Sequence, residues 1–177
     1  MDNLGVYTPE SDLQALESLA DVAGGSGCCV EVGSWAGTSA LRLSKVFDRV
    51  YCVDHFLGNA HDELSDISAG YSQEDVFGAF CRNVGSKLMN GIYPCVGTSR
   101  QWAAVWQFQV DLVFLDAEHT YEAVSEDIRV WLPHVKTGGI LCGHDYTSDF
   151  PMLAVAVQHS FGRDFSSLGR IWWHRVK

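Results

Sequence analysis

Four side chains that can exchange protons or bind a cation follow two apolar runs in the second half of the sequence. Asp116 ends the run DLVFLD, and His119 comes three residues later. His144 and Asp145 directly follow the run GILCG. Short continuous apolar runs are typical of strands buried on both faces of a parallel sheet. The carboxyl ends of such strands meet at one rim, where ligands bind, so we expect these four side chains to lie close together.

A glycine-bearing turn and an acid follow the first two apolar runs. Gly33 and Gly37 lie in VEVGSWAGTSA, and Asp54 ends VYCVD. Glycines allow a sharp turn and a close approach of a ligand, and the start of the next helix attracts an anion. The pattern is not the G-x-G-x-x-G of diphosphate sites, and the charge of Glu31 disfavours a diphosphate. An amino-acid zwitterion fits the turn better, and Asp54 stands where an acid binds ribose hydroxyls. An amino acid joined to ribose describes S-adenosylmethionine.

The apolar spacing predicts alternating strands and helices. Strands are expected at 28–32, 49–54, 92–96, 111–116 and 139–143, with a closing antiparallel hairpin of 163–168 and 170–176. Helices are expected from Thr8-Pro9 to 24, at 38–47, around 76–84, at 100–106, 121–131 and 152–161.

This alternation predicts an α/β fold. We expect one Rossmann-like, doubly wound domain over 1–177, with a seven-stranded, mostly parallel sheet and helices on both faces. The polar segment 57–72 is interpreted as a lid or short helix that contacts the acceptor substrate.

Composition narrows the classes of partner. The formal net charge of −10 disfavours nucleic acid and anionic membrane surfaces. No apolar run approaches the roughly 20 residues of a membrane span, and the acidic N-terminus lacks a signal-peptide core, so a cytoplasmic protein is expected. The six cysteines lie mostly in apolar runs without a C-x-x-C pair, so they are interpreted as buried packing residues.

Three motifs carry a family resemblance. VEVGSWAGTSALRLS resembles motif I of class I S-adenosylmethionine-dependent methyltransferases. DAEHTY and LPHVKTGGILCGHDY follow in the order and spacing of the small-molecule O-methyltransferases, both the catechol type and, more closely, the bacterial sugar and macrolide-sugar group. The resemblance spans about residues 10–175.

The resemblance implies a cofactor site on the first three strand ends. The methionine end would be lined by Glu31, Gly33, Ser34, Trp35, Gly37 and Ser39. The ribose and adenine would be contacted by Asp54, His55, Phe56, Thr98 and Ser99, with Phe56 as a stacking face.

It also implies catalytic roles for the other strand ends. Asp116, His144 and Asp145 would bind Mg²⁺ or Mn²⁺. The catechol type has Asp-Asn where His144-Asp145 stand here, which leaves open whether His144 is a ligand or a base; the alternative is that both aspartates only cap strands. His119 is expected to be the general base, since an unperturbed imidazole titrates near pH ~6.5; the alternative is a cap of the following helix.

The resulting hypothesis is methyl transfer to a hydroxyl of a small molecule, such as a sugar. The alternatives are a Rossmann-type oxidoreductase with a nucleotide cofactor, which the missing third glycine disfavours, and a non-catalytic module that binds S-adenosylmethionine. Trp172, Trp173 and His174 are interpreted as an edge strand that packs or forms a homodimer contact.

Overall fold

The computed structural model describes residues 8–57 and 71–177 and contains a seven-stranded sheet. The strands are β1 (Cys28–Val32), β2 (Arg49–Asp54), β3 (Ile92–Val96), β4 (Val110–Leu115), β5 (Val135–Gly143), β6 (Ser166–Leu168) and β7 (Ile171–Arg175). Their order is β3-β2-β1-β4-β5-β7-β6. The first five are parallel, and β7 pairs antiparallel with both β5 and β6. The predicted mostly parallel sheet with an antiparallel hairpin is confirmed.

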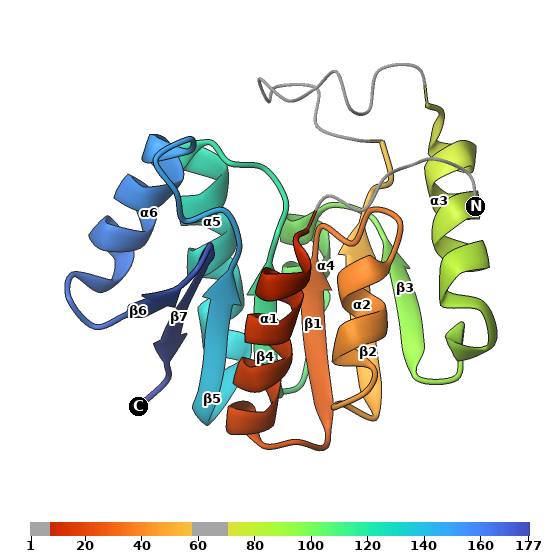
Figure 1. Ribbon diagram of the computed structural model, residues 1–177, viewed down its shortest axis with the longest axis horizontal. Coiled ribbons are helices and arrows are strands. Elements are labelled where there is room, and N and C mark those ends of the chain that lie inside the picture. The colour runs from red at the N-terminus through yellow and green to blue at the C-terminus, as the bar shows by residue number, and fades with distance from the viewer. Residues whose placement is uncertain (1–7, 58–70) are drawn as a thin grey trace.

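Helices cover both faces of the sheet (Figure 1). They are α1 (Glu10–Ala23), α2 (Thr38–Leu43), α3 (Gln73–Val84), α4 (Ser99–Val105), α5 (Tyr121–Trp131) and α6 (Pro151–Phe161), with short 3-10 turns η2 (Gly85–Lys87) and η3 (Leu132–His134). The first three helices pack on one face and the last three on the other. The arrangement is therefore the doubly wound one that the alternation predicts.

Alternate residues of each central strand face opposite layers of helices. In β1, Cys29 packs with the layer of α1 to α3, whereas Cys28 and Val30 pack with the layer of α4 to α6. Both layers are apolar, so the strands carry no polar face and appear as continuous apolar runs. All six cysteines are free, and five of them are buried.

Several predicted boundaries are wrong. Helix α2 ends at Leu43 rather than at residue 47. Strand β5 begins at Val135, four residues before the predicted 139. The predicted lid at 57–72 lies, apart from its flanks, outside the described residues. Trp172 is not on an edge strand, because β7 lies between β5 and β6.

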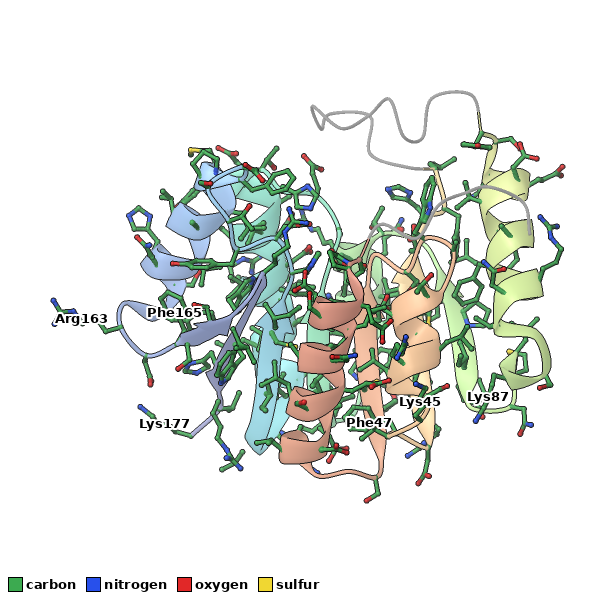
Figure 2. All side chains as sticks on the ribbon, in the orientation of Figure 1. Lys45, Phe47, Lys87, Arg163, Phe165 and Lys177 are labelled. Carbon is green, nitrogen blue, oxygen red and sulfur yellow. The ribbon has the colours of Figure 1, made fainter. Side chains whose placement is uncertain are left out.

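Helix α1 begins at the rim where the parallel strands end and runs toward their opposite ends (Figure 1). Its buried residues include Leu16, Leu19 and Ala20, which pack with strand residues in one core cluster. On its outer side, Arg42 of α2 donates to Glu17 over 3.3 Å, and Lys45, just after α2, donates to the same carboxylate over 2.8 Å. Figure 2 shows Lys45 and Lys87 in the lower half of the molecule, away from the rim. None of the helices within 8–57 and 71–177 has the length and apolar composition needed to cross a membrane.

Candidate active site

Asp116, His144 and Asp145 converge at the carboxyl ends of β4 and β5. These strands are adjacent and parallel, and each residue lies just past its strand end. Nδ1 of His144 lies 3.5 Å from Oδ1 of Asp116 and 3.2 Å from Oδ2 of Asp145. One ligand atom from each of the three residues lies within 4.8 Å of the others. The convergence predicted from the strand ends is thus present in the structure.

His119 joins the same cluster from the loop between β4 and α5. Its Nε2 lies 3.0 Å from Oδ2 of Asp145, and its ring centroid lies 4.2 Å from that of Phe150. The side chain of Thr120, not of His119, accepts the N–H of Ala123 and caps α5. The alternative interpretation of His119 as the helix cap is therefore wrong.

Asp12 is a member of this cluster that the sequence interpretation missed. Its Oδ2 lies 3.1 Å from Nε2 of His144, and both residues are buried. A signal was present in the sequence, because Asp12 shares the helical spacing of Leu16, Leu19 and Ala23, which form the buried face of α1. An acid on the apolar face of a helix needs a partner inside the fold.

The carboxylates control the protonation of His144. Burial by itself would lower the pKa of this imidazole, but hydrogen bonds and charges from Asp116 and Asp145 raise the pKa to about 11. Burial would raise the pKa of Asp145, yet hydrogen bonds from His119 and His144 hold that pKa well below its usual range. Asp145 also has a φ of 57°, an uncommon conformation that aims its side chain back at the cluster.

The glycine turn after β1 requires both of its glycines. Gly33 has a φ of 88°, and a Cβ there would lie 2.1 Å from the backbone oxygen of Asp116. Gly37 has a φ of 82°, and its Cβ would lie 2.9 Å from Val84 and 3.0 Å from Phe80 of α3. Gly33 therefore lets the ends of β1 and β4 approach, and Gly37 lets α2 begin against α3.

Glu31 is fully buried beneath this turn. Its burial raises the pKa of the carboxyl to about 7, partly opposed by the Ser34 and Ser39 hydroxyls that face it. Neither carboxyl oxygen makes a well-formed hydrogen bond to any described residue, and the same holds for Oγ of Ser34. Buried polar atoms without a partner indicate a missing ligand or water.

Asp54 organises the backbone of the rim. Its two oxygens accept the N–H of Trp35 over 2.8 Å and the N–H of Phe56 over 2.6 Å. These bonds join the ends of β1 and β2 and hold Trp35 at a φ of 45°. His55 follows, with Nδ1 accepting the N–H of Leu57 over 3.0 Å. Asp54 and His55 thus lie at the rim, as predicted.

The side chains of Phe56, Thr98 and Ser99, which were expected near the adenine, each contact other parts of the protein. Phe56 is 0% exposed and packs in the core against phenylalanines of α3, so its ring offers no stacking face in this conformation. Thr98 caps α4 in a capping box with Gln101. Ser99 turns toward α5, where its hydroxyl donates to Asp127 and accepts the indole N–H of Trp131 over 2.9 Å.

A small hollow opens beside the cluster. It is lined by Leu115, Asp116, Ala117, Glu118, His119, Val124, Asp127, His144, Leu153 and Trp172. Of these residues, only Asp116, His119 and His144 were assigned to the site from sequence, and Asp127 and Trp172 are among those that were missed. The Trp172 ring lies against Gly143, where a Cβ would be 2.6 Å from its Nε1. The hollow thus combines apolar side chains, such as Val124, Leu153 and Trp172, with the titratable groups of the cluster.

The sheet order, the glycine turn after β1 and the acid ending β2 define a class. They belong to the Rossmann-like, S-adenosylmethionine-dependent methyltransferases, whose fold binds ligands at the carboxyl ends of its parallel strands.

Comparisons with known proteins agree with this class. A family model described as a methyltransferase domain matches residues 30–146, so the chain belongs to this methyltransferase domain family. The structure of the O-methyltransferase NovP is similar to this chain with a TM-score of 0.72 at 18% sequence identity. The match covers 94% of this chain and 80% of the NovP chain. CalS11, a TDP-rhamnose 3'-O-methyltransferase, has a TM-score of 0.61 at 18% identity, with 93% and 78% covered. An rRNA methylase from Streptococcus thermophilus has a TM-score of 0.65 at 13% identity, with 98% and 100% covered.

Proposed function

We propose that the protein transfers the methyl group of S-adenosylmethionine to a hydroxyl oxygen of a small molecule, with a sugar as the leading acceptor class. We further propose that Mg²⁺ or Mn²⁺ binds at Asp116, His144 and Asp145 during the reaction. The observation that carries the proposal is the convergence of these three residues beside His119, at the carboxyl ends of the adjacent strands β4 and β5.

The geometry of the three residues fits a divalent cation. Adjacent ligands of an octahedral ion with bonds of about 2.1 Å lie roughly 3 Å apart. The separations of 3.2 and 3.5 Å from Nδ1 of His144 to the two carboxylates are close to that value. Two carboxylates and one imidazole form a donor set suited to Mn²⁺ and acceptable to Mg²⁺. When bound, such a cation would lower the pKa of a hydroxyl and orient it.

The cofactor fits the opposite part of the rim. The unpartnered carboxyl of Glu31 lies beneath the glycine turn, where it complements the positive charge of an amino-acid ammonium. Asp54 stands at the end of β2, and a carboxylate has room for more bonds than the two N–H groups that it accepts. These two acids bracket the expected positions of the methionine and ribose parts.

Methyl transfer needs an oxygen lone pair in line with the methyl carbon and sulfur. The acceptor oxygen forms the new bond to carbon, the carbon–sulfur bond breaks, and S-adenosylhomocysteine leaves with the bonding pair. The hydroxyl proton passes to a base, and His119 is the better candidate. Both ring nitrogens of His144 face carboxylates and its side chain is 4% exposed, whereas the side chain of His119 is 15% exposed. Nε2 of His119 lies 3.0 Å from the Asp145 carboxylate, which would stabilise the imidazolium that forms when His119 takes the proton.

The choice of acceptor has two supports. NovP and CalS11 carry O-methyltransferase in their names, and CalS11 acts on TDP-rhamnose. The rRNA methylase of similar fold represents the competing acceptor class. A net charge of −10 repels an RNA backbone, so we favour the small molecule.

The test combines binding and turnover. Calorimetry with S-adenosylmethionine, with nicotinamide dinucleotides as controls, should detect binding of the methionine cofactor alone. Formation of S-adenosylhomocysteine should then be followed over a panel of nucleotide sugars, glycosides, catechols and an rRNA fragment. Turnover only with a nicotinamide cofactor, or only on RNA, would refute the proposal.

The metal part is tested by removal and substitution. EDTA should abolish turnover, and added Mg²⁺ or Mn²⁺ should restore it. Asp116→Asn and Asp145→Asn should lose metal-dependent turnover while retaining most cofactor affinity, because the ion contacts the acceptor. Asp149→Asn, at an exposed acid of the following loop, is the matched control. Full activity in EDTA would remove the cation and leave His119 as the activating group.

A further inference from the structure

The position of Asp12 adds a residue to the metal centre. Its carboxylate lies beside Nε2 of His144, on the side of the ring opposite the pair formed by Asp116 and Asp145. Nε2 is thereby turned toward α1, and Nδ1 toward the two strand-end acids. Nε2 is therefore placed to donate to Asp12, and Nδ1 is placed among the proposed metal ligands.

The contact is built into the fold. Asp12 lies in the first turn of α1, and the apolar residues of the same helix face fix that turn against the sheet. The side chains of Asp12 and His144 are 5% and 4% exposed. A buried carboxylate next to an N–H is a strong, charge-assisted acceptor that water does not weaken.

We propose that Asp12 is a positioning residue of the metal centre: it accepts Nε2–H of His144 and so keeps the lone pair of Nδ1 directed at a divalent cation shared with Asp116 and Asp145. The inference rests on the metal site of the proposed function. Histidine ligands of metal centres are commonly held in one tautomer by such a partner, and loss of the partner typically weakens metal binding about 10–100-fold.

Ala at position 12 would remove the acceptor of Nε2–H altogether. Asn at position 12 keeps a side-chain oxygen that can still accept Nε2–H, although its NH₂ group could instead donate to Nε2. Asp12→Ala should therefore impair metal binding at least as much as Asp12→Asn, and it is the decisive variant.

The experiment measures Mn²⁺ binding directly, by electron paramagnetic resonance of the free ion. Wild type should bind Mn²⁺, and Asp12→Ala should bind it about 10–100-fold more weakly. Asp21→Ala, at an exposed position of the same helix, is the matched control and should bind like wild type. S-adenosylhomocysteine affinity and thermal unfolding of each variant distinguish a local change from loss of the fold.

The outcomes separate the inference from the proposed function. If Asp116→Asn loses Mn²⁺ while a folded Asp12→Ala keeps wild-type affinity, Asp12 has no positioning role and the metal site stands. If wild type itself binds no Mn²⁺, both ideas fail. Nitrogen-15 spectra of histidine-labelled, Mg²⁺-loaded wild type provide a readout that needs no variant: a proton on Nε2 and none on Nδ1 of His144 is expected, and the reverse would overturn the proposal.

Discussion

At the scale of single residues, Asp54 is at once a structural anchor and a proposed ligand of the ribose. Asp54→Ala should weaken S-adenosylmethionine binding by about 1–3 kcal/mol, the usual cost of removing a buried charged hydrogen-bond partner. Because the same carboxylate holds the N–H groups of Trp35 and Phe56, Asp54→Asn serves as the control that keeps one acceptor oxygen. Calorimetry showing wild-type affinity in Asp54→Ala would exclude the ribose role.

His119 is the second residue whose role can be isolated. His119→Ala should lower kcat by roughly 10²–10⁴-fold, the contribution of a positioned acid or base, with little change in cofactor affinity. His134→Ala is a matched control, since that imidazole contacts only the carbonyl of Ala103 among the described hydrogen bonds. Steady-state kinetics in which both variants behave like wild type would leave His119 as a packing partner of Phe150.

At the scale of elements, the turn between β1 and α2 depends on the packing of α2 against α3. Gly37→Ala should destabilise the fold by about 2–5 kcal/mol, because a left-handed φ costs about 1–2 kcal/mol for a residue with a Cβ and overpacking adds a further amount of about 1–3 kcal/mol. Gly25→Ala is the control, since Gly25 has a φ of 55° and nothing within 4 Å of its Cβ position. Urea unfolding should show a clearly larger loss of unfolding free energy for Gly37→Ala than for Gly25→Ala. Equal losses would mean that α3 shifts to accommodate the added methyl group.

At the scale of the whole molecule, the buried Glu31 makes stability depend on pH. Its pKa is about 7 in the folded chain against 4.5 for the exposed group. Between these values the folded state holds more protons than the unfolded state, so the free energy of unfolding falls as pH rises through this window. The stabilisation is complete below about pH 4.5 and lost above about pH 7. The difference of about 2.5 units corresponds to about 3 kcal/mol.

Glu31→Gln removes this dependence. Relative to wild type, the variant should gain about 3 kcal/mol in the free energy of unfolding on going from pH 4.5 to pH 8. Urea unfolding of the cofactor-free protein at both pH values measures it, with Glu122→Gln on the exposed side of α5 as control. Parallel pH profiles for wild type and Glu31→Gln would contradict a neutral buried carboxyl.

Much of the fold could be predicted because each central strand is buried on both faces. The continuous apolar runs at β1, β2 and β3 matched the observed bounds. The start of β5 was missed because Val135 is the only residue of 135–138 with an apolar side chain, and it pairs with β4 before the register shift that precedes Ile140. The end of α2 was missed because Phe47 fits a helical spacing but reaches the core from a turn.

The sequence by itself determined the rim: a chain of βαβ units must bring its strand ends to one edge, so the acids and histidines that follow those strands had to meet there. Only the tertiary structure decided which groups touch. Asp12 is 132 residues from His144, and its partner depends on where α1 packs. Ser99 turns toward Asp127 and Phe56 enters the core because neighbouring helices offer better contacts than the rim. Strand order follows from local patterns and chain connectivity, whereas side-chain partners follow from packing between distant segments, which spacing along the chain does not encode.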